Sequence, residues 1–186
     1  TCALPISGNS KATLSLTASQ LQSDADALAM VQGNYALAIS DVAIADVSAL
    51  ASNTHLASVS VLATGSDITS NLSTLTSLGA KVSSITQSDS AALTLSFANW
   101  NAHAGTLGKI RSGVLAQILN TPSSQITALL ADSRVQSMTV NDSGAELSAH
   151  IDTLLSMGPL LTQWAVSDSD PVRLDRKSTR LNSSHT

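Results

Sequence analysis

The sequence has one cysteine, Cys2, and only 2% of its 186 residues are aromatic and 12% charged. A single cysteine excludes a disulfide framework within the chain and a zinc site built from several cysteines. No run of about 18 apolar residues occurs, so we expect no membrane span. The net charge of −4 argues against nucleic-acid binding, because nucleic-acid partners require a basic surface.

The two ends of the chain do not read like the rest of it. Residues 1–6, TCALPI, and residues 175–180, DRKSTR, are what one short sequencing adapter encodes in one direction and in its reverse complement. We therefore expect residues 1–7 and 175–186 to be adapter-derived and to take no part in the fold. What remains reads as a gene fragment open at both ends. Its net charge is −6, because the ends remove three basic residues and one acidic residue.

The remaining sequence matches itself when it is shifted by 79 residues. Identical residues meet without a gap at many positions, among them Leu14 and Leu93, Val61 and Val140, Gly79 and Gly158, and the Ser-Asp-Ser of residues 88–90 and 167–169. We divide the chain into a first copy, residues 8–92, and a second copy, residues 93–174. Repeats of this kind bury their apolar faces against neighbouring repeats, which makes those neighbours the first expected partners.

Within each copy, two apolar periods alternate. Short segments in which every second residue is apolar begin near Leu14, Leu37, Val59 and Val82. This period of two predicts β-strands with one buried face. Between such segments, Ile68, Leu72 and Leu75 are spaced to share one face of a helix. Because short strand–helix–strand connections favour parallel strands, we predict an α/β fold: a repetitive strand–helix solenoid with a parallel sheet covered by helices.

The residues between these elements agree with the prediction. Gly79 and Gly158 each follow a predicted helix, where a left-handed residue is favoured. Asp41 aligns with Asn120, and both residue types suit a turn because their side chains bond to nearby backbone. Residues 121–122, Thr-Pro, predict a helix start with threonine as the N-cap and proline in the first helical position.

The polar residues with the clearest pattern are the aspartates of the recurring Ser-Asp-Ser. Asp89 and Asp168 hold the same position in the two copies, and Asp170 adds a carboxylate beside Asp168. A row of such carboxylates along the edge of a solenoid could hold calcium through hard oxygen ligands. The alternative is that an aspartate after a strand forms a turn or caps the next helix. Calcium at these three residues is the metal-site hypothesis that the sequence offers.

The other candidates for chemistry have structural interpretations. The histidines exchange with unlike residues across the repeat, His55 with Arg134, His103 with Asp24 and His150 with Asn71, which predicts solvent-facing positions. The tryptophans exchange with aliphatic residues, Trp100 with Leu21 and Trp164 with Ile85, which predicts core positions. No G-x-S-x-G motif is present. We therefore expect no catalysis in this chain and no cofactor other than calcium.

Several phrases of the sequence resemble a known kind of repeat. They are LSLTASQL at residues 14–21, DADALA at 24–29, YALAISD at 35–41 and NLSTL at 71–75. These are similar to the Ala/Thr/Asp-rich tandem repeats of very large bacterial proteins, where such repeats accompany hemolysin-type, calcium-binding modules. The likeness covers nearly all of residues 12–174. It implies an adhesin-like or stalk region that is secreted or lies on the cell surface, with an extracellular surface ligand as a further expected partner.

Three functions remain open from the sequence. The first is a structural or adhesive repeat region of a large bacterial surface or secreted protein. The second is a passive spacer next to an enzymatic or toxin domain encoded outside this fragment. The third is a calcium-binding module in its own right, which predicts that calcium stabilises the folded chain.

Overall fold

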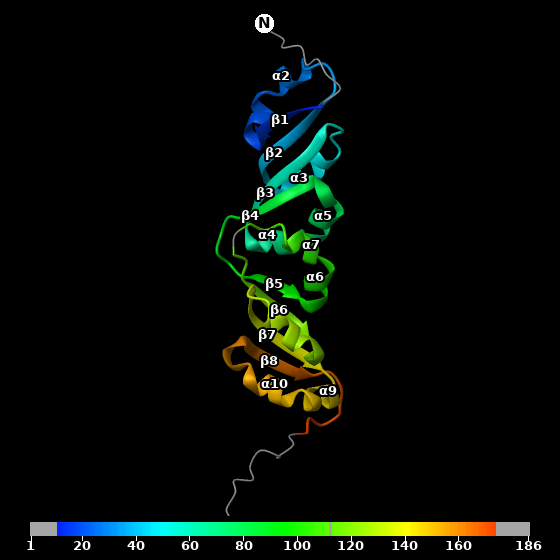
Figure 1. The fold of residues 1–186 in the computed structure, drawn as a ribbon, viewed down its shortest axis with the longest axis vertical. Helices are drawn as coiled ribbons and strands as arrows, with labels where there is room; N and C mark the ends of the chain where they lie inside the picture. The colour runs from blue at the N-terminus through cyan, green and yellow to red at the C-terminus, as the bar shows by residue number, and fades with distance from the viewer. Residues whose placement is uncertain (1–10, 112, 174–186) are drawn as a thin grey trace, which may run out of the picture. The chain divides into compact units, whose positions relative to one another are not determined.

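The computed structural model describes residues 11–111 and 113–173, which form two compact units (Figure 1). Unit 1 comprises Thr1–Leu93 and Ala102–Val114, and unit 2 comprises Thr94–Asn101 and Leu115–Thr186. The ends that we expect to be adapter-derived, residues 1–7 and 175–186, lie outside the described residues, so their origin stays a prediction.

Unit 1 alternates short strands with short helices. Its elements in order are β1 (Ala12–Thr17), α1 (Ala18–Ser23), α2 (Ala25–Ala29), β2 (Tyr35–Ala43), α3 (Ile44–Ala51), β3 (Leu56–Ala63), α4 (Gly65–Ser70), α5 (Leu72–Ser77), the 3₁₀ helix η1 (Gly79–Lys81), β4 (Val82–Gln87) and α7 (Ala104–Leu107). The strands pair in parallel in the order β1-β2-β3-β4, with Leu14 opposite Leu37 and Val59 opposite Val82. The predicted parallel sheet of an α/β fold is confirmed in this unit.

Unit 2 is built with a similar series of elements. They are β5 (Leu93–Ser96), α6 (Phe97–Ala102), β6 (Ala116–Thr121), the 3₁₀ helix η2 (Ser123–Gln125), α8 (Ile126–Leu130), β7 (Val135–Asp142), α9 (Gly144–Ala149), α10 (Ile151–Ser156), the 3₁₀ helix η3 (Gly158–Leu160) and β8 (Leu161–Val166). The sheet order is β5-β6-β7-β8, and Met138 of β7 lies opposite Leu161 of β8. Within the described ranges, each helix is too short or too polar to cross a membrane.

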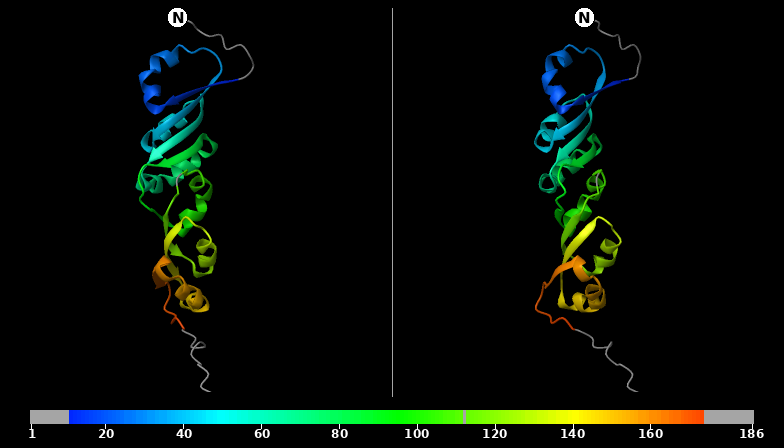
Figure 2. Two further views of the ribbon diagram at one scale, coloured as in Figure 1. Left: turned by 60° about the vertical axis from the view of Figure 1, so that its left-hand side comes forward. Right: turned by 90° about the vertical axis from the view of Figure 1, so that its left-hand side faces the viewer.

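Each sheet has an apolar face that its helices cover (Figure 2). In unit 1 the buried side chains alternate along the strands and recur on the inward sides of the helices: Leu37, Ile39, Val59, Val61, Val82 and Ile85 from strands, and Val47, Ile68, Leu72 and Leu75 from helices. The residues between them on the strands are small and polar, such as Ser58 and Ser60 of β3. The period of two in the sequence therefore marks the strands and their buried face correctly.

The residues that begin and end the helices repeat at corresponding positions. The Thr64 hydroxyl accepts a hydrogen bond from the Asp67 N–H at the start of α4, and the Ser143 hydroxyl accepts one from the Glu146 N–H at the start of α9, both at 3.2 Å. Each bond satisfies a backbone donor that the helix itself leaves free. After the following helices, Gly79 and Gly158 have φ of +51° and +55°, so the predicted left-handed glycines are confirmed.

Asp41 and Asn120 occupy the same unusual backbone conformation. Both have φ of +56°, and both lie inside a strand, where the pairing with the next strand shifts register. The turn predicted at this position is thus a bulge within β2 and β6 rather than a connection between elements. Asn and Asp tolerate the left-handed region better than other side-chain-bearing residues, which accounts for their exchange across the copies.

Two sequence predictions were wrong. The helix after β6 begins at Ser123 with Pro122 as its N-cap, while Thr121 ends the strand and its buried hydroxyl has no hydrogen-bond partner. Trp164 is 42% exposed, although Ile85, its counterpart in the first copy, is fully buried. Trp100, by contrast, is buried as predicted. Trp164 differs because the described residues hold no strand beside the outer edge of β8.

Candidate functional site

Asp89 lies in the turn that follows β4, and its carboxylate reaches the start of α4. Its Oδ1 accepts hydrogen bonds from the Gly65 N–H at 3.0 Å and from the Gln87 Nε2 at 2.7 Å. Gln87 also donates from Nε2 to the Ala91 carbonyl at 2.6 Å, which closes the turn. The hydrogen bonds from Gln87 and then from Gly65 lower the pKa of Asp89, since both stabilise the charged form.

Asp168 makes the corresponding contact in unit 2. Its Oδ1 accepts hydrogen bonds from the Gly144 N–H at the start of α9, at 3.0 Å, and from the Asp170 N–H at 3.2 Å. The Asp170 side chain is exposed, and its backbone carbonyl lies against Gly144. Each carboxylate thus ties the turn after one strand to the helix that precedes it by 24 residues, in the helix-capping role that the sequence left open beside calcium.

The three candidate calcium ligands fall in different units. Asp89 belongs to unit 1, whereas Asp168 and Asp170 belong to unit 2 and share one turn. In the described residues, no group of three or more His, Cys, Asp or Glu side chains is arranged to hold a metal ion. Their backbone and side-chain hydrogen bonds account for Asp89 and Asp168 without a metal, so calcium binding stays a prediction.

The hydrogen bonds of Asp89 predict how stability depends on pH. Because its pKa is lower in the folded chain than the value of about 3.9 of an unfolded aspartate, its contribution is complete above that value and is lost as the pH falls through the folded-state value. We expect the midpoint of thermal unfolding to fall on acidification below about pH 4. An Asp89→Asn variant, which keeps an acceptor oxygen but no charge, should show a weaker fall over the same range.

The same unfolding measurement in calcium and in a chelator separates a helix cap from a metal ligand. If Asp89 and Asp168 act as caps, the midpoint stays the same in both conditions. A midpoint that rises with calcium, and that Asp89→Asn and Asp168→Asn abolish, would identify the carboxylates as calcium ligands, because a ligand bound only to the folded state stabilises it.

A second carboxylate, Asp142 at the end of β7, was not singled out by the sequence. Its Oδ2 accepts hydrogen bonds from the N–H and hydroxyl of the buried Ser123, at 2.9 and 2.8 Å, and its Oδ1 accepts one from the Ser143 N–H at 2.9 Å. Burial favours a higher pKa for Asp142, but the hydrogen bonds from Ser123 and Ser143 outweigh it and lower the pKa. The first copy has Ala63 and Ile44 at these positions, so the repeat offered no signal for the pair.

Arg134 is the residue that connects charge to the core of unit 2. Its guanidinium donates from Nη2 and Nε to the Asp132 carboxylate at 2.6 and 2.9 Å, and it stands 4.7 Å from the centre of the Trp100 ring. The hydrogen bond between them lowers the pKa of Asp132 and raises that of Arg134. Such an Arg over an indole face adds to packing as well as to charge pairing.

In the first copy the same turn uses neutral residues. His55 replaces Arg134 and stacks on Tyr35 with ring centres 4.0 Å apart, and the Asn53 side chain accepts a hydrogen bond from the His55 N–H at 2.8 Å. The predicted solvent-facing role is therefore incomplete for both residues, because each covers an aromatic ring. Both contacts join positions that are distant in the sequence, which the comparison of the copies could not reveal.

His103 joins two helices of unit 1. The Thr76 hydroxyl of α5 lies 2.8 Å from His103 Nδ1 and 2.8 Å from the hydroxyl of Thr106, which is buried in α7. Threonine hydroxyls can donate and accept, so the three groups satisfy one another. His150 instead accepts or donates locally, 3.0 Å from the Glu146 carbonyl.

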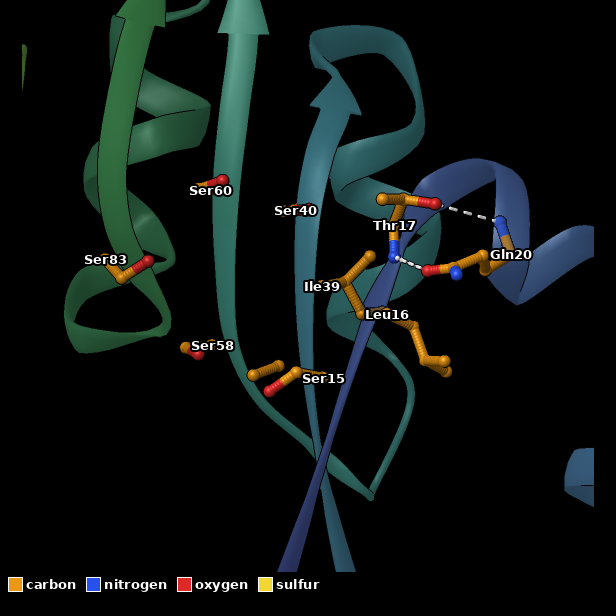
Figure 3. A pocket seen from close by; sticks show the side chains of 10 residues that line it. Ser15, Leu16, Thr17, Gln20, Ile39, Ser40, Ser58, Ser60 and Ser83 are labelled. Atoms are coloured by element: carbon orange, nitrogen blue, oxygen red, sulfur yellow. Dashed lines mark hydrogen bonds between the residues drawn. The ribbon is translucent and has the colours of Figure 1, made fainter.

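The open face of the sheet in unit 1 carries a cleft of about 310 Å³ that is lined by hydroxyl groups (Figure 3). Its lining residues come from all four strands and the start of α1: Ser15, Leu16, Thr17, Gln20, Ala38, Ile39, Ser40, Ser58, Ser60 and Ser83. None of them carries a charge, so the cleft suits a neutral, hydroxyl-bearing ligand rather than an ion. The sequence analysis missed this cleft because serine is too common in the chain to mark a site.

No protein-family model, curated protein or solved structure matches this chain. The contacts above are therefore the basis for a function. They place the chain among α/β proteins with parallel sheets covered by helices.

Proposed function

We propose that this chain is a stretch of a strand–helix solenoid and serves as a structural repeat region of a large secreted or surface bacterial protein. The observation that carries the proposal is the agreement between elements 79 residues apart. Three pairs have the same type and place in their units: β3 with β7, α4 with α9, and α5 with α10. A scaffold of this kind gains its stability from contacts between neighbouring repeats and needs no catalytic residue.

The contacts between elements recur with the same spacing. The carboxylates of Asp89 and Asp168 each accept a hydrogen bond at 3.0 Å from the first residue of a helix, Gly65 and Gly144. The strand contacts recur as well, because the Ser83 hydroxyl donates to the Val59 carbonyl and that of its counterpart Thr162 donates to the Met138 carbonyl. Shared tertiary contacts support a repeated unit more strongly than shared composition, since the partners are 24 residues apart.

An adhesive role is the second candidate, and the hydroxyl-lined cleft favours it. Ser15, Ser40, Ser58, Ser60 and Ser83 present hydroxyl groups on an open sheet face, and parallel strands repeat them about 4.8 Å apart. Repeated hydroxyl groups can exchange hydrogen bonds with the hydroxyl groups of a carbohydrate. A long array would multiply such weak contacts through avidity.

Extending the array tests the structural proposal. An additional copy of residues 93–171, inserted directly after Pro171, should fold onto the chain and raise the midpoint of thermal unfolding, because it adds one interface between repeats. Its four strands should lengthen the particle in small-angle scattering by about 19 Å or more, at about 4.8 Å for each strand.

The matched control is an insert of the same composition in scrambled order, which should add unfolded chain and no increase in midpoint. If the true copy behaves like the scrambled one, with no gain of helix or strand signal in circular dichroism, the solenoid proposal is wrong.

A further inference from the structure

The outer edge of β4 in unit 1 is covered by a short segment of the same chain. The Ile85 N–H donates to the Lys109 carbonyl, and the Arg111 N–H donates to the Ile85 carbonyl, both at 3.0 Å. These bonds form a parallel bridge between Ile85 and Ile110. With Leu107 buried beside it, the segment leaves Ile85 with no exposed surface.

The corresponding edge in unit 2 is open. Trp164 of β8 takes the place of Ile85 and is 42% exposed, as is Val166 two residues further on. Leu155, on the helix before this strand, is 72% exposed. An apolar strand edge with free backbone groups is a ready template for pairing with another chain.

The counterpart of the covering segment is also uncovered. Leu28 and Val31 stand 79 residues before Leu107 and Ile110, yet both are half-buried, and Met30 between them is 72% exposed. Val31 has the same β-branched shape as Ile110 and no charge. The first copy therefore presents the segment that the second copy lacks at its open edge.

We propose that two copies of this chain associate head to tail, with residues 30–32 of one copy pairing along the outer edge of β8 in the other. Val31 then takes the position of Ile110, and Trp164 takes the position of Ile85 with its N–H and carbonyl both bonded. The occupant is a second copy because this chain covers the equivalent edge with its own equivalent segment. This inference rests on the repeat arrangement proposed above.

The contact is heterologous, since the two partners use different surfaces. Each added copy leaves one head and one tail free, so association continues into a linear array unless the geometry closes a ring. One favourable contact of unit 1 is missing at this junction: Lys109 Nζ donates to the Gly79 carbonyl at 2.6 Å, whereas its counterpart at the junction is Met30. A Met30→Lys variant would restore that hydrogen bond to the Gly158 carbonyl of the neighbouring copy.

Sedimentation of the full chain at increasing concentration tests the proposal. We expect the sedimentation coefficient of the native chain to rise with concentration, and that of Met30→Lys to rise at lower concentration. Val31→Asp destroys the head and Trp164→Asp the tail, so each variant alone should remain monomeric. A 1:1 mixture of the two should form dimers and stop there, because only one intact head meets one intact tail.

The control is Leu62→Asp, which places the same charge on an exposed leucine of β3 and should associate like the native chain. Circular dichroism shows whether each variant is folded. A native chain that stays monomeric, or a Val31→Asp variant that dimerises alone, would overturn the head-to-tail contact. If the chain stays monomeric while the inserted repeat folds, the association fails and the structural role stands.

Discussion

Replacing Leu154 by alanine is expected to lower the free energy of unfolding by about 2–5 kcal/mol, while Leu155→Ala should change it by less than about 0.5 kcal/mol. The two residues are neighbours in α10, but Leu154 is 3% exposed and Leu155 72% exposed. Only the first substitution removes side-chain atoms from the core and leaves a cavity. Urea denaturation of both variants, at concentrations low enough to keep the chain monomeric, measures the difference.

The pair controls for everything except the direction of the side chain. Both substitutions remove the same atoms and introduce the same helix former into one helix. Equal losses at the two positions would contradict the orientation of α10. That outcome would also weaken the correspondence with α5, where Leu75, the counterpart of Leu154, is fully buried.

The sequence was sufficient to predict the strands, most of the helices and the parallel sheet. Alternation placed β3 and β4 because each has one helix-covered face, so every second residue is constrained to be apolar. The left-handed positions at Gly79 and Gly158 were also readable, since only glycine reaches that backbone conformation without strain. These features share a local cause, which is why one chain without relatives was enough.

The misses concern residues whose environment depends on distant segments. Trp164 follows the core pattern of the sequence, but burial of that position requires a covering strand, which Ile85 has and Trp164 lacks. The bond between Asp142 and Ser123 joins positions 19 residues apart and occurs in one copy only. The role of Asp89 as a cap was foreseen, but not that it caps the preceding helix rather than the next one.

The recurring glycine at the start of a helix also lacked an explanation until the turn was seen. A methyl group on Gly144 would overlap the Asp170 backbone carbonyl, and one on Gly65 would lie 3.0 Å from the Ala91 carbonyl. Both helices begin so close to the turn after the next strand that no side chain fits between them. The glycine and the capping aspartate are therefore parts of one contact.

Gly144→Ala is expected to destabilise unit 2 by about 1–3 kcal/mol, because the obstacle is a backbone carbonyl that cannot rotate away. Displacing that turn also removes the 3.0 Å hydrogen bond from the Gly144 N–H to Asp168. Gly65→Ala should cost less, since its nearest obstacle, the Gln87 amide at 2.9 Å, belongs to a flexible side chain. Thermal unfolding of the two variants gives the order.

Gly105→Ala is the matched control, because Gly105 lies in α7 with nothing within 4 Å of the added methyl group. Alanine is the better helix former by up to about 1 kcal/mol, so this variant should be neutral or more stable. If all three alanines had the same effect, the close approach of turn and helix would not be the reason for the glycines. A loss confined to Gly144 and Gly65 would tie them to the contact that Asp168 and Asp89 complete.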